Sequence, residues 1–163
     1  MKKVFFGLIG LMIAFNAVAE DRKLASPDGR IEVTVSDSDG TPDYSVTYDG
    51  NVFSLPSPLG LNTSMGEYVS GMTMLPEKEA PRLIEEQYSL KTIKQSQVDY
   101  KAVEAVFTFA QNERPVYDVI FRVSDRDVAF RYRMYPRRNT LSCVIFNEAT
   151  GFLLPQTATA FLC

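Results

Sequence analysis

The side chains that could carry out chemistry in this chain are carboxylates, because its 163 residues include 20 aspartates and glutamates and no histidine. Without histidine, serine–histidine and cysteine–histidine catalysis is excluded, as is any metal site that needs imidazole. A glycosidase needs two carboxylates across a sugar ring. The acidic pairs are Asp37 with Asp39, Glu85 with Glu86, and Asp125 with Asp127. Each pair falls in an expected loop or strand entry, where solvation accounts for it, so the spacing selects no catalytic pair.

Other candidate binding residues also have ordinary structural explanations. Asp37 and Asp39 could hold Ca²⁺ through oxygen ligands, but their loop lacks the closing glutamate of a calcium-loop motif. Arg137 and Arg138 follow Pro136 and are more typical of a solvated rim than of an anion clamp. Sugars stack on exposed aromatic rings, yet tryptophan is absent. Most aromatic residues lie in the inward phase of expected strands, which favours core packing for Tyr117, Phe121, Phe130 and Tyr132.

The composition is that of one globular domain, with 45% hydrophobic and 23% charged residues. The formal net charge of −3 argues against nucleic-acid binding, which requires a basic surface to meet phosphate.

The first 19 residues have the pattern of a signal peptide. Lys2 and Lys3 precede an apolar run from Val4 to Phe15, and Ala17-Val18-Ala19 provides a cleavage site. An uncleaved anchor helix is the alternative, but the run is too short to span a bilayer comfortably. We expect a mature chain of residues 20–163, in the periplasm, with no membrane span after cleavage.

Disulfides are permitted in the periplasm, and the two cysteines are Cys143 and Cys163. A bridge between them is conceivable. The favoured interpretation is a buried strand thiol at Cys143 and a frayed end at Cys163.

Apolar residues alternate with polar ones along most of the mature chain, which predicts strands with one buried face. The alternating sets are Ile31, Val33 and Val35; Tyr44, Val46 and Tyr48; Val103, Ala105, Phe107 and Phe109; Tyr117, Val119, Phe121 and Val123; and Val128, Phe130, Tyr132 and Met134, opposite Arg131 and Arg133. With no convincing helical spacing, the sequence predicts an all-β fold, a two-layer sandwich.

Turn residues separate these strands. The segment 37–42 is an expected loop, and Asp49-Gly50-Asn51 can supply the positive φ angles of a tight hairpin. Residues 124–127 predict a second hairpin loop, with Asp127 in a left-handed conformation. The segment 77–88 is expected to be a loop that leads into a strand through Tyr88 and Leu90, with one short helical turn possible.

The order of several segments resembles the N-terminal domain of glycoside hydrolase family 97. The segments are SPDGRIEV (26–33), YSVTYDG (44–50), PSPLGL (56–61), IFRV (120–123), DVAFRY (127–132) and TATAF (157–161). One departure is Asp127, where the family usually has glycine, a change that still permits the hairpin.

The resemblance implies a β-super-sandwich, similar to galactose-mutarotase-like domains, that packs against a catalytic (β/α)₈ barrel. It implies hydrolysis of α-glucosidic or α-galactosidic bonds in the full-length enzyme, with calcium in the active site and catalytic carboxylates outside this chain. No catalytic, metal or cofactor-binding residue is therefore assigned here. The resemblance also implies an incomplete sandwich that stops within a strand at residues 161–163, before the C-terminal barrel.

The function expected is that of an N-terminal sandwich module of a periplasmic α-glycosidase, residues 20–163, which braces the barrel and borders the carbohydrate site. Alone it is expected to be inactive. The alternatives are a free-standing periplasmic carbohydrate-binding module and a chain that does not fold stably.

Overall fold

The computed structural model describes residues 21–89, 91, 97–137 and 142–159. The expected signal peptide, Arg138 and residues 161–163 lie outside this range. The described part consists of strands and one 3₁₀ turn, η1 (Ser38–Gly40). None of its helices is long and apolar enough to cross a membrane. The strands are β1 (Arg22–Ala25), β2 (Ile31–Ser36), β3 (Asp43–Tyr48), β4 (Asn51–Pro58), β5 (Leu61–Thr63), β6 (Gly66–Tyr68), β7 (Met72–Met74), β8 (Arg82–Ser89), β9 (Gln97–Gln111), β10 (Arg114–Ser124), β11 (Val128–Met134) and β12 (Ile145–Glu148).

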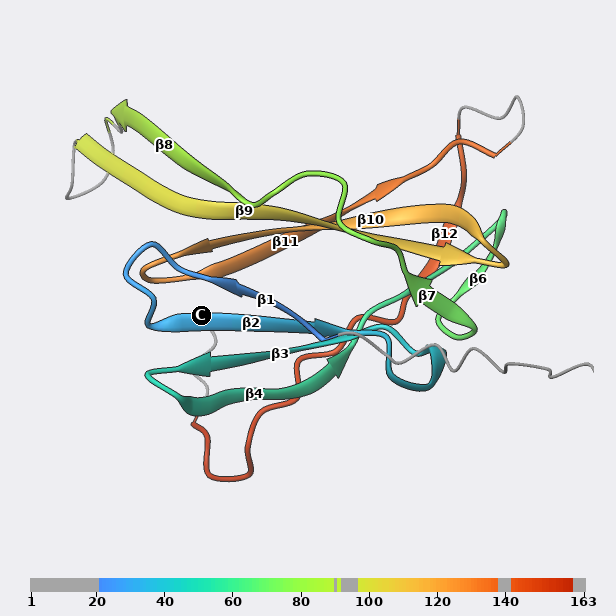
Figure 1. The fold of residues 1–163 in the computed structure, drawn as a ribbon, viewed down its shortest axis with the longest axis horizontal. Helices are drawn as coiled ribbons and strands as arrows, with labels where there is room; N and C mark the ends of the chain where they lie inside the picture. Colours follow the sequence, from blue (N-terminus) through green and yellow to red (C-terminus); the bar gives the residue numbers. More distant parts are fainter. Residues whose placement is uncertain (1–20, 90, 92–96, 138–141, 160–163) are drawn as a thin grey trace, which may run out of the picture.

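Two antiparallel sheets face each other (Figure 1). The four-stranded sheet has the order β1-β2-β3-β4. The five-stranded sheet has the order β11-β10-β9-β7, and β8 also pairs with β9. A small third sheet, β12-β5-β6, continues from β4. The all-β sandwich predicted from the alternating pattern is therefore confirmed.

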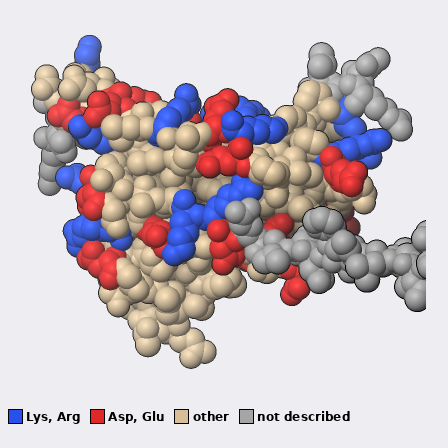
Figure 2. Space-filling view, in the orientation of Figure 1, with Lys and Arg blue, Asp and Glu red and all other residues tan. Residues whose placement is uncertain are grey.

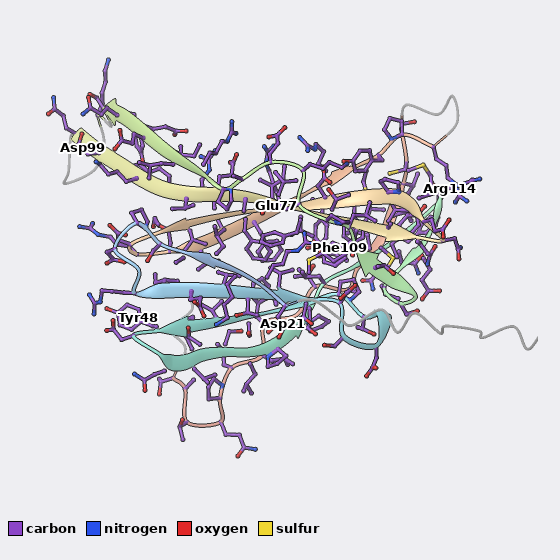
Figure 3. The ribbon with its side chains drawn as sticks, in the orientation of Figure 1. Asp21, Tyr48, Glu77, Asp99, Phe109 and Arg114 are labelled. Atoms are coloured by element: carbon purple, nitrogen blue, oxygen red, sulfur yellow. The ribbon has the colours of Figure 1, made fainter. Side chains whose placement is uncertain are left out.

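The core lies between the two large sheets and is built from the inward phase of each strand. Val33 and Val35 of β2 and Phe109, Tyr117 and Phe121 from the opposite sheet have no solvent exposure. Figure 3 shows Phe109 in this layer. Phe130 and Tyr132 are partly buried and pack against the core, so the prediction that these aromatic residues are core residues is confirmed.

The chain after β12 extends the ladder alongside β4 and β5. β12 pairs with β5, and the following residues run antiparallel to the end of β4. The Ala149 amide donates to the Gly60 carbonyl at 2.9 Å, and the Leu55 amide donates to the Leu153 carbonyl at 2.8 Å. This segment places Phe152 beside Tyr44, with ring centroids 6.5 Å apart.

The segment 77–88 forms no helical turn. It runs through a loop into β8, which pairs with the first half of β9. The predicted strand through Tyr88 is therefore confirmed, and Leu90 lies outside the described residues. In β8 only Ile84 is half-buried and the other side chains are exposed. The β8–β9 hairpin consequently reaches past the other strands as an arm (Figure 1).

The hairpin turns confirm one prediction and contradict another. Asp49 and Gly50 have φ angles of 48° and 75°, as a tight turn requires. Asp127 is not in the left-handed region, which among the described non-glycine residues holds Asp39, Asp49, Asn112 and Glu113. The Ser124 hydroxyl instead accepts hydrogen bonds from the amides of Arg126 and Asp127, at 3.1 and 3.0 Å. These bonds stabilise the turn without a positive φ at Asp127.

The prediction that Cys143 is a buried strand thiol is wrong. Cys143 precedes β12 and is half-buried. Its pairing with Cys163 is untested, because Cys163 lies outside the described residues.

Candidate functional site on the outer face of the five-stranded sheet

Two carboxylates are buried on the outer face of the five-stranded sheet, away from the sandwich core. Glu104 of β9 is 4% exposed and Asp118 of β10 is 0% exposed. Each alternates with core residues, so its side chain projects to the opposite face. The neighbours Thr108 and Ile120 on that face are buried too. We call this surface, with its arginine partners, the charged face.

Asp118 has a hydrogen-bond donor on each carboxylate oxygen. The Thr108 hydroxyl donates to Oδ1 at 2.7 Å, and the Tyr135 hydroxyl donates to the same oxygen at 3.0 Å. Arg133 donates from Nε to Oδ2 at 2.8 Å, and its Nη2 lies 2.6 Å from the same oxygen. Both oxygens of the aspartate are thus satisfied by charged and neutral donors, as a buried carboxylate requires.

Glu104 is bound by two arginines from neighbouring strands. Arg82 donates to Oε1 from Nε at 3.0 Å, and Arg122 donates to Oε2 from Nε and Nη2 at 3.1 and 2.8 Å. Burial alone would raise the pKa of Glu104, but the hydrogen bonds and charges of the two arginines outweigh it and hold the pKa below its ordinary value. Arg122 also reaches Glu86 at 3.4 Å. The result is a chain of four alternating charges across β8, β9 and β10.

These ion pairs can stabilise the sheet or contact a partner, but they are not arranged for proton transfer. A general acid needs a raised pKa and an oxygen free to meet the substrate. Both oxygens of Glu104 and of Asp118 are already occupied by donors. A shallow groove of about 230 Å³ runs beside them, lined by Lys78, Arg131 and Arg133 among others. Figure 2 shows basic and acidic side chains mixed along the upper part of the molecule.

The acidic pairs singled out from the sequence make local structural contacts. Asp37 accepts a hydrogen bond from the Met74 amide at 2.7 Å, whereas Asp39 is exposed. Glu85 is exposed and lies 2.6 Å from Lys101. Asp125 accepts a bond from the Asp28 amide at 2.9 Å. These contacts link neighbouring turns and strands, and they support no catalytic role.

Arg137 contacts the protein itself. Its guanidinium donates to the carbonyl of Met65 and lines an open cavity of about 480 Å³ together with Arg114 and Tyr135. Arg138 lies outside the described residues.

Glu104 and Asp118 were not identified by the sequence analysis. Each is a single acid within a strand that is apolar in both phases, VEAVFTF and VYDVIF. Apolar residues in both phases indicate a sheet covered on both faces, so a lone charge there must be paired. That signal could have identified both residues, but not their partners.

Comparison with known proteins agrees with this fold. A family model described as "Glycosyl-hydrolase 97 N-terminal" matches residues 24–163. A probable retaining alpha-galactosidase from Streptomyces bingchenggensis (strain BCW-1) is 29% identical over 138 residues, 85% of this chain and 20% of the relative.

Solved structures give the same assignment of fold. The crystal structure of a beta-arabinopyranosidase is 33% identical, with a TM-score of 0.77 over 83% of this chain and 22% of that one. A glycoside hydrolase family 97 enzyme from Pseudoalteromonas sp. strain K8, in complex with panose, is 23% identical with a TM-score of 0.73. The match covers 83% of this chain and 20% of that enzyme. The chain thus spans about one fifth of the length of these relatives.

The family model covers residues 24–163 of the 163, and the sandwich is the fold shared with the matched part of these enzymes. The chain belongs to the glycosyl-hydrolase 97 N-terminal family.

Proposed function

We propose that this chain is the N-terminal sandwich module of a longer periplasmic α-glycosidase that acts on α-glucosides or α-galactosides. The module braces the catalytic barrel and borders its carbohydrate site, and it supplies no catalytic group from the residues described. The observation that carries this proposal is the family match over residues 24–163. The chain that gives this match spans one fifth of the length of its curated relative.

The chemistry of the charged face supports a module without catalytic groups. Its buried carboxylates, Glu104 and Asp118, are locked by arginines and hydroxyl donors. A carboxylate whose two oxygens are already held by donors stabilises a surface but is not placed to exchange a proton with a substrate. The exposed arms of Arg82, Arg131 and Arg133 leave this surface able to contact a partner domain.

The family resemblance implies a calcium ion in the active site of the full-length enzyme. The residues described in this structure do not by themselves form a site for that ion. Across residues 21–89, 91, 97–137 and 142–159, no three cysteine, aspartate or glutamate side chains are grouped closely enough to hold a metal. The pKa of Asp43 is raised by its burial and by the charges of Asp21 and Asp37. We therefore assign no step to calcium here.

Aryl glycoside hydrolysis tests the proposal directly. The purified mature chain is incubated with aryl α-glucosides and aryl α-galactosides, beside the Glu104→Gln variant. We expect release of the aryl group at the rate of a protein-free blank for both proteins. Turnover by the wild-type chain that a single carboxylate substitution removes would overturn the assignment of a non-catalytic module.

A further inference from the structure

The strand register arranges the charged face in rows that cross β9, β10 and β11. In one row Glu104 of β9 pairs with Arg122 of β10, and in another Asp118 of β10 pairs with Arg133 of β11. Each arginine binds the carboxylate that the register places beside it, at 2.8 Å. Figure 1 shows this sheet above the four-stranded sheet, so the charged face is the upper surface of the molecule in that view.

The row between these two contains an arginine but no carboxylate. It runs from Val106 of β9 through Ile120 of β10 to Arg131 of β11. Ile120 is buried and Val106 is half-buried, whereas Arg131 is exposed. Arg131 forms no hydrogen bond or ion pair with the residues that the structure describes. The central row therefore places an unpaired cation beside an apolar strip.

Two shallow hollows adjoin at this row, because Ile120 and Arg131 line both of them. Their volumes are about 230 and 270 Å³. Lys78 lines the first hollow and donates a hydrogen bond to the Tyr135 hydroxyl at 3.4 Å. Glu79 lines it as well. Across the described part of the chain, neither Lys78 nor Arg131 forms an ion pair with Glu79 or with any other carboxylate. Both cations can therefore accept a carboxylate from outside this module.

Two features favour a covered face over a solvated one. First, β9 and β10 carry apolar residues in both phases, which is typical of a sheet that is covered on both sides. Second, the chain as a whole is acidic, with a formal net charge of −3, yet the unpaired charge in the central row of this face is the Arg131 cation. A local charge opposite to that of the whole chain favours a partner surface that carries carboxylates.

We propose that the charged face is the surface on which the rest of the longer protein docks, and that an aspartate or glutamate from beyond residue 163 pairs with Arg131. The planar guanidinium of arginine binds a carboxylate through two parallel hydrogen bonds, and the strip of Val106 and Ile120 packs against apolar neighbours of that acid. The inference rests on the proposed function, because it requires the chain to be a module of a larger protein. The chain spans about one fifth of its relatives, so the same polypeptide would supply the partner.

A free anion and a second copy of the module are the competing partners. A free anion such as phosphate would pair with Arg131 but would leave the apolar strip in contact with water. A second copy would supply its carboxylate from within residues 20–163. A docked domain differs from both, because it covers the apolar strip and supplies a carboxylate from outside that range.

Arginine modification of the longer protein, purified as the product of its native gene, tests whether the face is covered. Phenylglyoxal labels accessible guanidinium groups, and the same protein unfolded in urea provides the fully labelled reference. The described module alone leaves Arg131 exposed. We expect the folded longer protein to label Arg131 roughly tenfold more slowly than the unfolded protein, because labelling must wait for the interface to open. Labelling of Arg131 at the rate of the unfolded protein would overturn the proposal.

Charge reversal tests whether the partner is acidic. Arg131→Glu places a carboxylate opposite the partner's carboxylate, so we expect the labelling of Arg133, on the same strand and face, to rise roughly tenfold in the longer protein. Arg126→Glu is the matched control, because it makes the same change of charge at an exposed residue of the 124–127 turn, and it should leave the labelling of Arg133 unchanged. Equal effects of the two variants, or no effect of Arg131→Glu, would overturn the proposal.

Arg131→Lys identifies the partner residue. A water-soluble carbodiimide joins a lysine amine to a contacting carboxylate as an amide and takes up the water that is lost, whereas the guanidinium of the wild type does not react and provides the control. We expect a peptide from β11 joined to an aspartate or glutamate beyond residue 163. A bond to a carboxylate within residues 20–163, or no bond, would overturn the proposal. A gene product no longer than residues 20–163 would instead refute the proposed function, so the mass of the product separates the two failures.

Discussion

Asp118 and Arg133 form a fork on the outer face of the sandwich. The Nε and Nη2 atoms of Arg133 both approach Oδ2 of Asp118, at 2.8 and 2.6 Å. The aspartate has no solvent exposure, while the arginine side chain is 58% exposed. A buried charge is therefore neutralised by a partner that water can reach. This relationship explains how a carboxylate is tolerated beneath the surface of a sheet.

Loss of this partner should destabilise the fold. Arg133→Ala leaves Asp118 with only the hydroxyls of Thr108 and Tyr135, and we expect the free energy of unfolding to fall by about 1.5–3 kcal/mol, the range for hydrogen bonds to charged groups. Urea denaturation measures the change. Arg131→Ala is the control, because Arg131 projects from the same strand and face; a surface change of this kind costs within about 0.5 kcal/mol. Equal losses for the two variants would contradict the role of the fork.

The stability of the chain should depend on pH through Glu104. Its pKa is lower in the folded protein than the ordinary value of 4.5, so its ion pairs contribute fully above that value. That contribution is lost as the pH falls through the lowered pKa of the folded state. We expect Glu104→Gln to be less stable near neutral pH and to lose less stability on acidification than the wild type. Denaturation midpoints across this range provide the measurement, with Glu67→Gln as the control because Glu67 is exposed and lies outside this network. Parallel pH curves for wild type and Glu104→Gln would refute the prediction.

Two tyrosines, the partly buried Tyr132 and the fully buried Tyr117, should respond differently to removal of their hydroxyl groups. The Tyr132 hydroxyl accepts from the Gly60 amide at 3.0 Å and lies 2.8 Å from the Thr150 hydroxyl. Tyr132→Phe should cost about 1–3 kcal/mol, because it leaves a part-buried amide without its partner. The Tyr117 hydroxyl is buried with no partner among the described residues, and burial raises the pKa of Tyr117 above its ordinary value. Tyr117→Phe should leave stability unchanged or raise it. Thermal unfolding of both variants provides the measurement. A larger loss of stability for Tyr117→Phe than for Tyr132→Phe would contradict the hydrogen bonding described.

The alternating pattern predicted the strands well because one face of each is buried. Ile31, Val33 and Val35 alternate with polar residues and lie in the core as expected. The charged face was missed because pairing across strands depends on register, which a single strand does not encode: Glu104 meets Arg122 only because β9 and β10 pair at those residues. Asp127 was misjudged because the Ser124 side chain stabilises the turn locally, an arrangement that competes with a left-handed residue.

The exposure of Phe53 could not be predicted from the strand pattern. Phe53 lies near the start of β4, at the register shift between β3 and β4. Such a shift is a property of the paired strands and is not encoded in either strand alone. By contrast, the order of segments was sufficient for the family resemblance, which the family model now shows.

The intact mass of the native protein tests the central claim most directly. An antibody raised against residues 26–61 captures the product from source cells, and mass spectrometry gives its size before it is assayed on aryl α-glycosides. We expect a species several times heavier than the 18.3 kDa of this sequence, because the chain covers about one fifth of its relatives. We also expect that species to hydrolyse an α-glucoside or α-galactoside. A single species near the mass of residues 20–163, without hydrolytic activity, would contradict the account of this chain as a module of a larger glycosidase.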